Sequence, residues 1–119
     1  MTEKDLMWNK FIEDICYRDM ASLSEVQRKA VLCFWYDAEM NSGGHSGYMD
    51  CYPDTDTREL AAAILSIGYK EIADNYFKAV AEGKNDNWIE TDNAYYNFSP
   101  SLCGCFREYV ENNKEVIFE

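Results

Sequence analysis

A glycine-rich stretch over residues 40–53 holds the only histidine of the chain, His45, and three of its six glycines. Histidine is a common general base near neutral pH, so this stretch is the first place to look for catalysis. It lacks the Gly-x-Ser-x-Gly arrangement of an exposed nucleophilic serine. It also lacks a phosphate-binding glycine loop, and no lysine or arginine lies between residues 40 and 57. A structural turn is therefore the better interpretation, and no catalytic residue is predicted.

Metal binding is disfavoured by the pattern of acidic and sulfur-containing side chains. Asp50, Asp54, Asp56 and Glu59 follow the glycine stretch, but their spacing is not that of an EF-hand loop and no central glycine divides them. The five cysteines contain no Cys-x-x-Cys pair, and a single histidine gives little for structural zinc. We expect neither a metal nor a cofactor. The three aspartates are predicted to form a solvated acidic patch that could meet a basic partner.

Glu39 lies at the end of a predicted helix, where the helix dipole disfavours a carboxylate. Such an acid is tolerated if its carboxylate accepts hydrogen bonds from the backbone N–H groups of the following turn. We therefore expect Glu39 to hold that turn, with an ordinary solvated glutamate as the alternative. The glycines suit a chain that needs positive φ or a close backbone approach. The residues assigned to this structural turn are Glu39, Asn41, Gly43, Gly44, His45 and Tyr48.

The C-terminal segment carries the most regular charge pattern. Glu108, Glu111, Glu115 and Glu119 recur at spacings of three, four and four residues. On a continuous helix these carboxylates would share one face, about 4.5 to 6 Å apart along the axis. The row approximates the regularly spaced anions of a DNA strand, although an ordinary solvated face gives the same spacing. We take these four glutamates as the main candidate surface for a partner.

The elements that must position these residues are all predicted to be helices. Apolar periodicity and capping signals predict helices over residues 3–19, 24–40, 56–67, 70–82, 92–98 and from residue 100 onward. Residues 30–36 are apolar on every side, which predicts a central buried helix. Residues 84–92 are predicted to be a polar loop around a Trp88–Ile89 anchor. The prediction is one compact all-α domain over residues 1–119, with five or six helices around that central helix.

Charge sets the class of partner. Twenty-two acidic and eleven basic residues give a net charge of −11, with a pI near 4.4. Nucleic acid and anionic membranes would be repelled, because both are bound through Lys and Arg. The N-terminus has no signal-peptide pattern, and Cys16 and Cys33 fall on apolar helical positions. A cytoplasmic protein with reduced thiols is expected, for which the charge serves a basic partner or solubility alone.

Several segments together carry a family resemblance. They are residues 36–39, residues 41–48 with the Gly43–Gly44 turn, residues 62–68 ending in Ile-Gly, Ala73, Ala79, and the tail over residues 87–111. This pattern resembles a bacterial helical family of largely unknown function that includes the acidic DNA-mimic protein. The chain departs from the usual pattern at Ser42, His45 and Gly47. The resemblance implies a helical, non-enzymatic module that presents carboxylates to a basic, DNA-binding protein surface.

The sequence thus predicts an acidic protein-interaction module, with a DNA mimic that occupies a regulator's DNA site as the leading hypothesis. An immunity protein against a basic toxin would use the same electrostatics. A third hypothesis is a small-ligand or enzymatic site at the glycine turn, lined by Tyr36, His45 and Tyr48. A homodimer formed through surplus aromatic side chains is the fourth.

Overall fold

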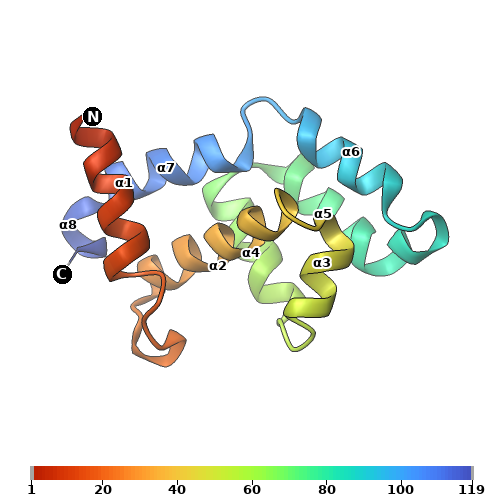
Figure 1. Cartoon of the computed structure of the whole chain (residues 1–119), viewed down its shortest axis with the longest axis horizontal. Coiled ribbons are helices and arrows are strands. Elements are labelled where there is room, and N and C mark those ends of the chain that lie inside the picture. The colour runs from red at the N-terminus through yellow and green to blue at the C-terminus, as the bar shows by residue number, and fades with distance from the viewer. Residues whose placement is uncertain (1, 119) are drawn as a thin grey trace.

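Helices joined by short connections make up residues 2–118, the part of the chain that the computed structural model describes (Figure 1). No strand occurs within those residues, so the all-α prediction is confirmed. The α-helices are α1 (Glu3–Asp14), α2 (Glu25–Met40), α3 (Gly44–Cys51), α4 (Thr57–Ile67), α5 (Lys70–Glu82), α6 (Ile89–Asn97), α7 (Leu102–Asn112) and α8 (Lys114–Ile117). Two short 3₁₀ helices accompany them, η1 (Met20–Ser22) and η2 (Gly83–Asp86).

Two helices begin at caps that the sequence predicts. Ser24 caps α2: its hydroxyl accepts the N–H of Gln27 at 3.2 Å, and the Gln27 side chain accepts the N–H of Ser24 at 2.9 Å. Asp56 caps α4 and accepts the N–H groups of Arg58 and Glu59 at 3.0 and 3.2 Å. A side-chain cap of this kind stabilises a helix by about 1 kcal/mol. The predicted starts of both helices are confirmed.

The central helix is α2, which packs against α3, α4, α7 and α8. It buries an apolar set that runs along its whole length: Ala30, Val31, Cys33, Tyr36 and Met40. Figure 1 shows α2 and α7 running beside one another along the long axis of the molecule, which extends 42 Å. The prediction of a buried central helix is confirmed.

Two groups of buried side chains lie along this axis. One gathers between α2, α4, α5 and α7 and includes Tyr36, Ile64 and Phe106. The other joins α1 and α8 to α2 and α7, at the end where both termini lie in Figure 1. Trp8 and Phe34 contact both groups, with ring centroids 6.0 Å apart. The helices of the two ends therefore pack onto one continuous set of side chains.

The described residues form eight α-helices, so the predicted count of five or six is wrong. One additional helix is α3, which occupies residues that the sequence assigned to a turn. The other arises because the C-terminal helix ends at Asn112 and a separate short helix, α8, follows. The first helix is also shorter than predicted, since it ends at Asp14 and not near residue 19.

The connection from α5 to α6 differs from the predicted polar loop. Trp88 adopts a left-handed backbone conformation with φ 61°, and α6 begins directly after it, three residues earlier than predicted. Its indole Nε1–H donates to the carbonyl of Ala79 at 3.0 Å. A Cβ on Gly83 would lie 2.1 Å from the Trp88 ring, so only glycine leaves room for the indole. Trp88 is the anchor of this connection, whereas Ile89 is 61% exposed and anchors nothing.

Candidate functional site

The negative charge of the chain is concentrated in one part of the molecule. Residues 36–92 hold twelve acidic and four basic side chains, which gives −8 of the total −11. They form the end of α2 and the helices α3 to α6, of which α3, α5 and α6 lie towards the right-hand end of Figure 1. The helices α1, α7 and α8 at the other end hold seven acidic and four basic side chains, a net charge of −3. The sequence pattern predicted the C-terminal glutamates as the main contact surface. A count of acidic and basic residues by segment would have identified residues 36–92 from the sequence alone.

Several acids of the charged half are used by the fold itself. Asp37 accepts hydrogen bonds from the hydroxyl of Tyr95 and from Asn41, the latter at 3.1 Å. Asp56 caps α4, and Asp86 accepts the N–H of Glu90 at 2.9 Å. These carboxylates are committed to internal contacts and are poor candidates for binding a partner.

Three further acids of this half are paired with bases. Glu59 lies 2.8 Å from the guanidinium of Arg28, Asp74 lies 2.6 Å from the ammonium of Lys70, and Glu90 pairs with Lys78. Six exposed carboxylates of residues 36–92 have no ion pair within the described residues, and four of them also accept no main-chain N–H as Asp56 and Asp86 do: Asp50, Asp54, Glu71 and Glu82. These four are the acids that the fold leaves available, and two of them belong to the patch predicted from the sequence.

The glycine stretch folds into the start of α3. Gly44 has φ +66°, and a Cβ on it would lie 2.5 Å from Oδ2 of Asp92. Both the backbone conformation and the space therefore require glycine here. Asn41 ends α2, and Gly43 approaches Gly47 so closely that a Cβ would lie 3.1 Å from its Cα.

His45 is buried in a chain of hydrogen bonds. Its backbone N–H donates to Oδ1 of Asp92 at 3.0 Å, and its Nδ1 lies 2.7 Å from the same oxygen. Its Nε2 lies 2.5 Å from the hydroxyl of Tyr36. Burial lowers the pKa of His45, against the opposing effect of Asp92. The neutral ring then carries its proton on Nδ1, donates to Asp92 and accepts from Tyr36.

This Asp92–His45–Tyr36 chain has the order of a general-base relay, yet solvent reaches only the Asp92 carboxylate, which is 26% exposed, and neither ring. The side chains of Tyr36 and His45 are 0% exposed, and burial raises the pKa of Tyr36 well above its ordinary value. A substrate cannot contact either ring in this conformation. The ligand site predicted at Tyr36, His45 and Tyr48 is therefore corrected. The chain of hydrogen bonds joins α2, α3 and α6.

The clasp predicted for Glu39 is made by a different group. The carbonyl oxygen of Glu39 accepts the N–H groups of Ser42 and Gly43 at 3.0 and 2.8 Å. Its carboxylate lies next to Cys51, whose thiol pKa is raised by desolvation and by that negative charge. The turn is thus held by main-chain hydrogen bonds, as at an ordinary helix end, and the side-chain clasp is corrected.

The predicted row of C-terminal glutamates is interrupted. Because α7 ends at Asn112, Glu115 belongs to a separate helix, and the prediction of one continuous helical face is wrong. Glu108 is exposed, whereas Glu111 pairs with Lys4 of α1 at 3.5 Å. Glu119 lies outside the described residues. The bases Arg107 and Lys114 stand among these acids along the chain, so the surface is mixed in charge.

The described residues contain no group of three or more His, Cys, Asp or Glu side chains that could hold a metal ion. A hollow of about 550 Å³ has walls from Trp35, Tyr48 and Tyr52, with Arg18 and Asp54 also lining it. It lies beside the aspartate patch and carries charges of both signs. None of the helices in the described part of the chain has the length and hydropathy of a membrane span.

The fold and surface define a helical protein with one strongly acidic half and a closed interior. The family model for DMP19-like protein matches residues 21–115, and the chain belongs to that family. Helix α1 lies outside the matched residues. No curated protein matches the chain, and no solved structure does either.

Proposed function

We propose that this protein is a non-enzymatic DNA mimic, which binds the basic DNA-binding surface of another protein through its acidic half. The observation that carries the proposal is the charge of residues 36–92, −8 out of −11. Membership of the DMP19-like family and the resemblance to the DNA-mimic protein support the same function. The contact residues we propose are Asp50, Asp54, Glu71 and Glu82, which are exposed and carry no ion pair within residues 2–118.

Electrostatics explain how such a surface would work. A DNA-binding protein carries clustered Lys and Arg side chains that normally displace counterions from phosphates. Carboxylates fixed on short helices can take the place of those phosphates without the flexibility of a disordered acidic tail. The attraction would speed association and would weaken with ionic strength, because exposed charges are screened over about 10 Å at 0.1 M salt.

The burial of the single histidine supports a role without catalysis. His45 and Tyr36 are the side chains whose contacts most resemble those of a catalytic base, and neither reaches solvent. Burial raises the pKa of Cys33, so that thiol stays protonated and unreactive at neutral pH. A binding function needs none of these groups to be accessible.

The proposal is tested by affinity capture from the native host with matched bait proteins. One bait carries D50N, D54N, E71Q and E82Q. A control bait carries E3Q, E13Q, D14N and D19N, which changes the net charge by the same amount outside residues 36–92. We expect the wild type and the control to retain a basic protein that added duplex DNA releases, and the first variant to lose it.

Three results would overturn the proposal: equal capture by both variants, retention that high salt leaves unchanged, or a captured protein that duplex DNA cannot displace. The identity of the captured protein decides between the two partner classes. A transcription regulator fits the DNA mimic, whereas a nuclease toxin that the protein inhibits fits an immunity function.

A further inference from the structure

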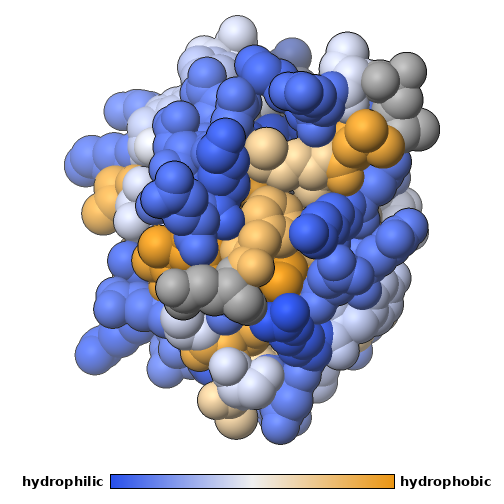
Figure 2. All heavy atoms as spheres, turned by 90° about the vertical axis from the view of Figure 1, so that its left-hand side faces the viewer, coloured by the Kyte–Doolittle hydropathy of each residue, from blue (hydrophilic) through white to orange (hydrophobic). Residues whose placement is uncertain are grey.

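An apolar groove crosses the end of the molecule where α1, α7 and α8 meet. Figure 2 looks onto this end and shows a strip of hydrophobic atoms between hydrophilic flanks. Two adjoining hollows that share Met7 form the groove, one of about 180 Å³ between α1 and α7 and one of about 450 Å³ between α1 and α8. Leu6 and Phe118 line the second hollow, and Leu6 is 57% exposed. A large apolar side chain this exposed, in a continuous strip, indicates a surface for a partner.

The groove differs in charge from the rest of the protein. Its lining includes four basic and three acidic side chains: Lys4, Lys10, Arg107, Lys114, Glu108, Glu111 and Glu115. The lining therefore carries a net charge of +1 in a chain whose total is −11. Residues 36–92 would repel a second copy of this chain, whereas the lining of the groove carries no negative net charge that would do so.

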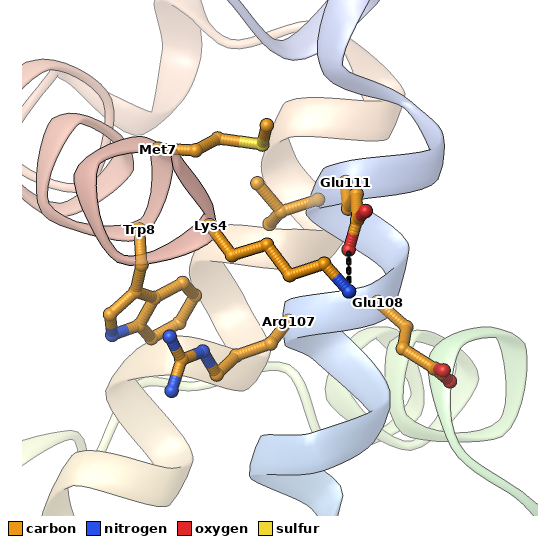
Figure 3. A pocket seen from close by; sticks show the side chains of 7 residues that line it. Lys4, Met7, Trp8, Arg107, Glu108 and Glu111 are labelled. Carbon is orange, nitrogen blue, oxygen red and sulfur yellow. Dashed lines mark ion pairs between the residues drawn. The ribbon is translucent and has the colours of Figure 1, made fainter. Parts of the chain in front are cut away.

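The two rims of the groove are complementary. The α1 rim contributes only cations among its charged lining residues, Lys4 and Lys10. The opposite rim, from α7 and α8, contributes all three glutamates together with Arg107 and Lys114, so its net charge is −1 against +2 on the α1 rim. Figure 3 shows Lys4 reaching across the first hollow to Glu111, 3.5 Å away, so the rims already attract one another within one chain. In the second hollow, Lys10 belongs to the α1 rim, where its ammonium lies 5.4 Å from the centre of the Phe118 ring, and Glu115 belongs to the opposite rim.

We propose that this groove is the interface of a two-fold homodimer. In a symmetric dimer each surface meets a copy of itself. With the two-fold axis along the groove, the α1 rim of one copy faces the α7–α8 rim of the other. Lys10 then lies opposite Glu115 of the partner subunit, and the reciprocal pair forms by symmetry. The apolar strips, with Leu6 and Met7, close against one another between the two rows of charges.

The experiment measures the dimer dissociation constant by sedimentation velocity over a concentration series. We expect a reversible dimer for the wild type. Loss of one exposed ion pair weakens an association by up to about fivefold, and the two-fold axis repeats that loss at a second, identical pair. K10E or E115K alone should therefore weaken the dimer about tenfold or more. The double variant K10E/E115K exchanges the two charges and should restore the dimer. If the two positions do not face each other across the interface, the double variant should bind no more tightly than the single variants.

Two further variants separate this surface from general charge effects. K84E changes the net charge as K10E does but lies outside the groove, so it should leave dimerisation unchanged. L6S removes an exposed apolar side chain and should weaken the dimer at high salt as well as at low salt. Circular dichroism and thermal melting confirm that each variant is folded. A wild type that stays monomeric into the millimolar range, or a charge swap that fails to restore the dimer, would overturn the proposal.

Discussion

The single histidine contributes to this protein as a buried connector. Its ring joins Tyr36 of α2 to Asp92 of α6, and its main chain begins α3. Each hydrogen bond of this kind contributes about 1 kcal/mol net, but leaving one buried group unpaired costs more. Because the three groups satisfy each other, removing the ring would leave Tyr36 and Asp92 without their partner. The residue thus holds three helices together at a point where no apolar side chain could.

The buried histidine should make the protein less stable in mild acid. Burial lowers the pKa of His45 in the folded state, with Asp92 opposing, while the unfolded chain titrates near the ordinary value of about 6.5. Below that pH the unfolded state binds more protons, so the free energy of unfolding falls as the pH falls. The slope from one histidine is at most about 1.4 kcal/mol per pH unit. Urea unfolding at several pH values between about 7.5 and about 5.5 gives the free energy of unfolding at each pH, and from these values the slope.

The matched variant for that titration is H45Q, which keeps a polar side chain and the main-chain N–H but cannot take up a proton. Its free energy of unfolding should be lower than that of the wild type at neutral pH and should vary less over the same range. Asp37 acts in the opposite sense at lower pH, because burial raises its pKa and protonation then favours the folded state. Equal slopes for the two proteins between about pH 7.5 and about pH 5.5 would contradict the prediction.

At the scale of the element, α3 is a helix that its own sequence supports weakly. Its eight residues include two glycines, and glycine within a helix costs about 0.5–1 kcal/mol relative to alanine. Contacts with other elements compensate. The Asp92 carboxylate of α6 accepts a hydrogen bond from the main-chain N–H of His45. The Tyr48 side chain is buried against Tyr36, with ring centroids 5.2 Å apart. The helix exists because α2 and α6 provide the place for it.

Replacing the first residue of α3 tests this dependence. G44A forces a non-glycine residue to φ +66° and places a methyl group 2.5 Å from Asp92, so the carboxylate must leave its position. We expect a loss of about 2 kcal/mol in the free energy of unfolding, measured by urea denaturation. G104A is the control. Its Cβ would meet nothing closer than 3.5 Å within α7, and it should gain about 0.5–1 kcal/mol. Two variants of equal stability would contradict the prediction.

The elements that sequence reasoning found and missed differ in what stabilises them. The starts of helices α2 and α4 can be predicted from Ser24 and Asp56, because a capping side chain accepts a main-chain N–H only two or three residues away. Helix α3 was missed because its stabilising carboxylate, Asp92, is 47 residues from His45. No period or spacing encodes such a contact. The break at Asn113 was missed for a related reason, since the apolar stripe continues through it to Ile117.

The site shows the same division. That His45 lies in a glycine turn was visible, but its burial and its pairing with Tyr36 depend on how α2, α3 and α6 pack. The acidic half could have been found from the sequence by counting charges in segments, because residues 36–92 hold twelve of the 22 acids. Which of those acids are available could be predicted only in part: the pair of Lys70 with Asp74 follows from their i,i+4 spacing on one helix, but the pairs of Arg28 with Glu59 and of Lys78 with Glu90 depend on how the helices pack.

At the scale of the whole molecule, the negative charge is distributed unevenly over the structure. Residues 36–92 carry −8 of the net charge of −11, while α1, α7 and α8 carry −3 between them and form the end with the apolar groove. The two proposals use different ends of this arrangement. A dimer joined at the groove would leave both acidic halves free, which suits a two-fold symmetric regulator that binds DNA with two equivalent basic surfaces. Failure of either proposal leaves the other standing, because they share no contact residue.

The same uneven distribution of charge predicts how salt affects stability. Twelve acids against four bases within residues 36–92 repel one another, and the resulting cost falls as salt screens them. The exposed ion pairs act in the opposite direction but contribute little individually. We expect the free energy of unfolding to rise by on the order of 1 kcal/mol between about 0.02 M and about 0.5 M sodium chloride.

The variant D50N/D54N/E71Q/E82Q should be more stable than the wild type at low salt and should gain less from added salt. The control variant E3Q/E13Q/D14N/D19N has the same net charge but keeps the acidic half intact, so it should respond to salt nearly as the wild type does. A stability that falls with added salt would show that the ion pairs outweigh the repulsion, and equal responses of the two variants would show that net charge, and not its position, governs the effect.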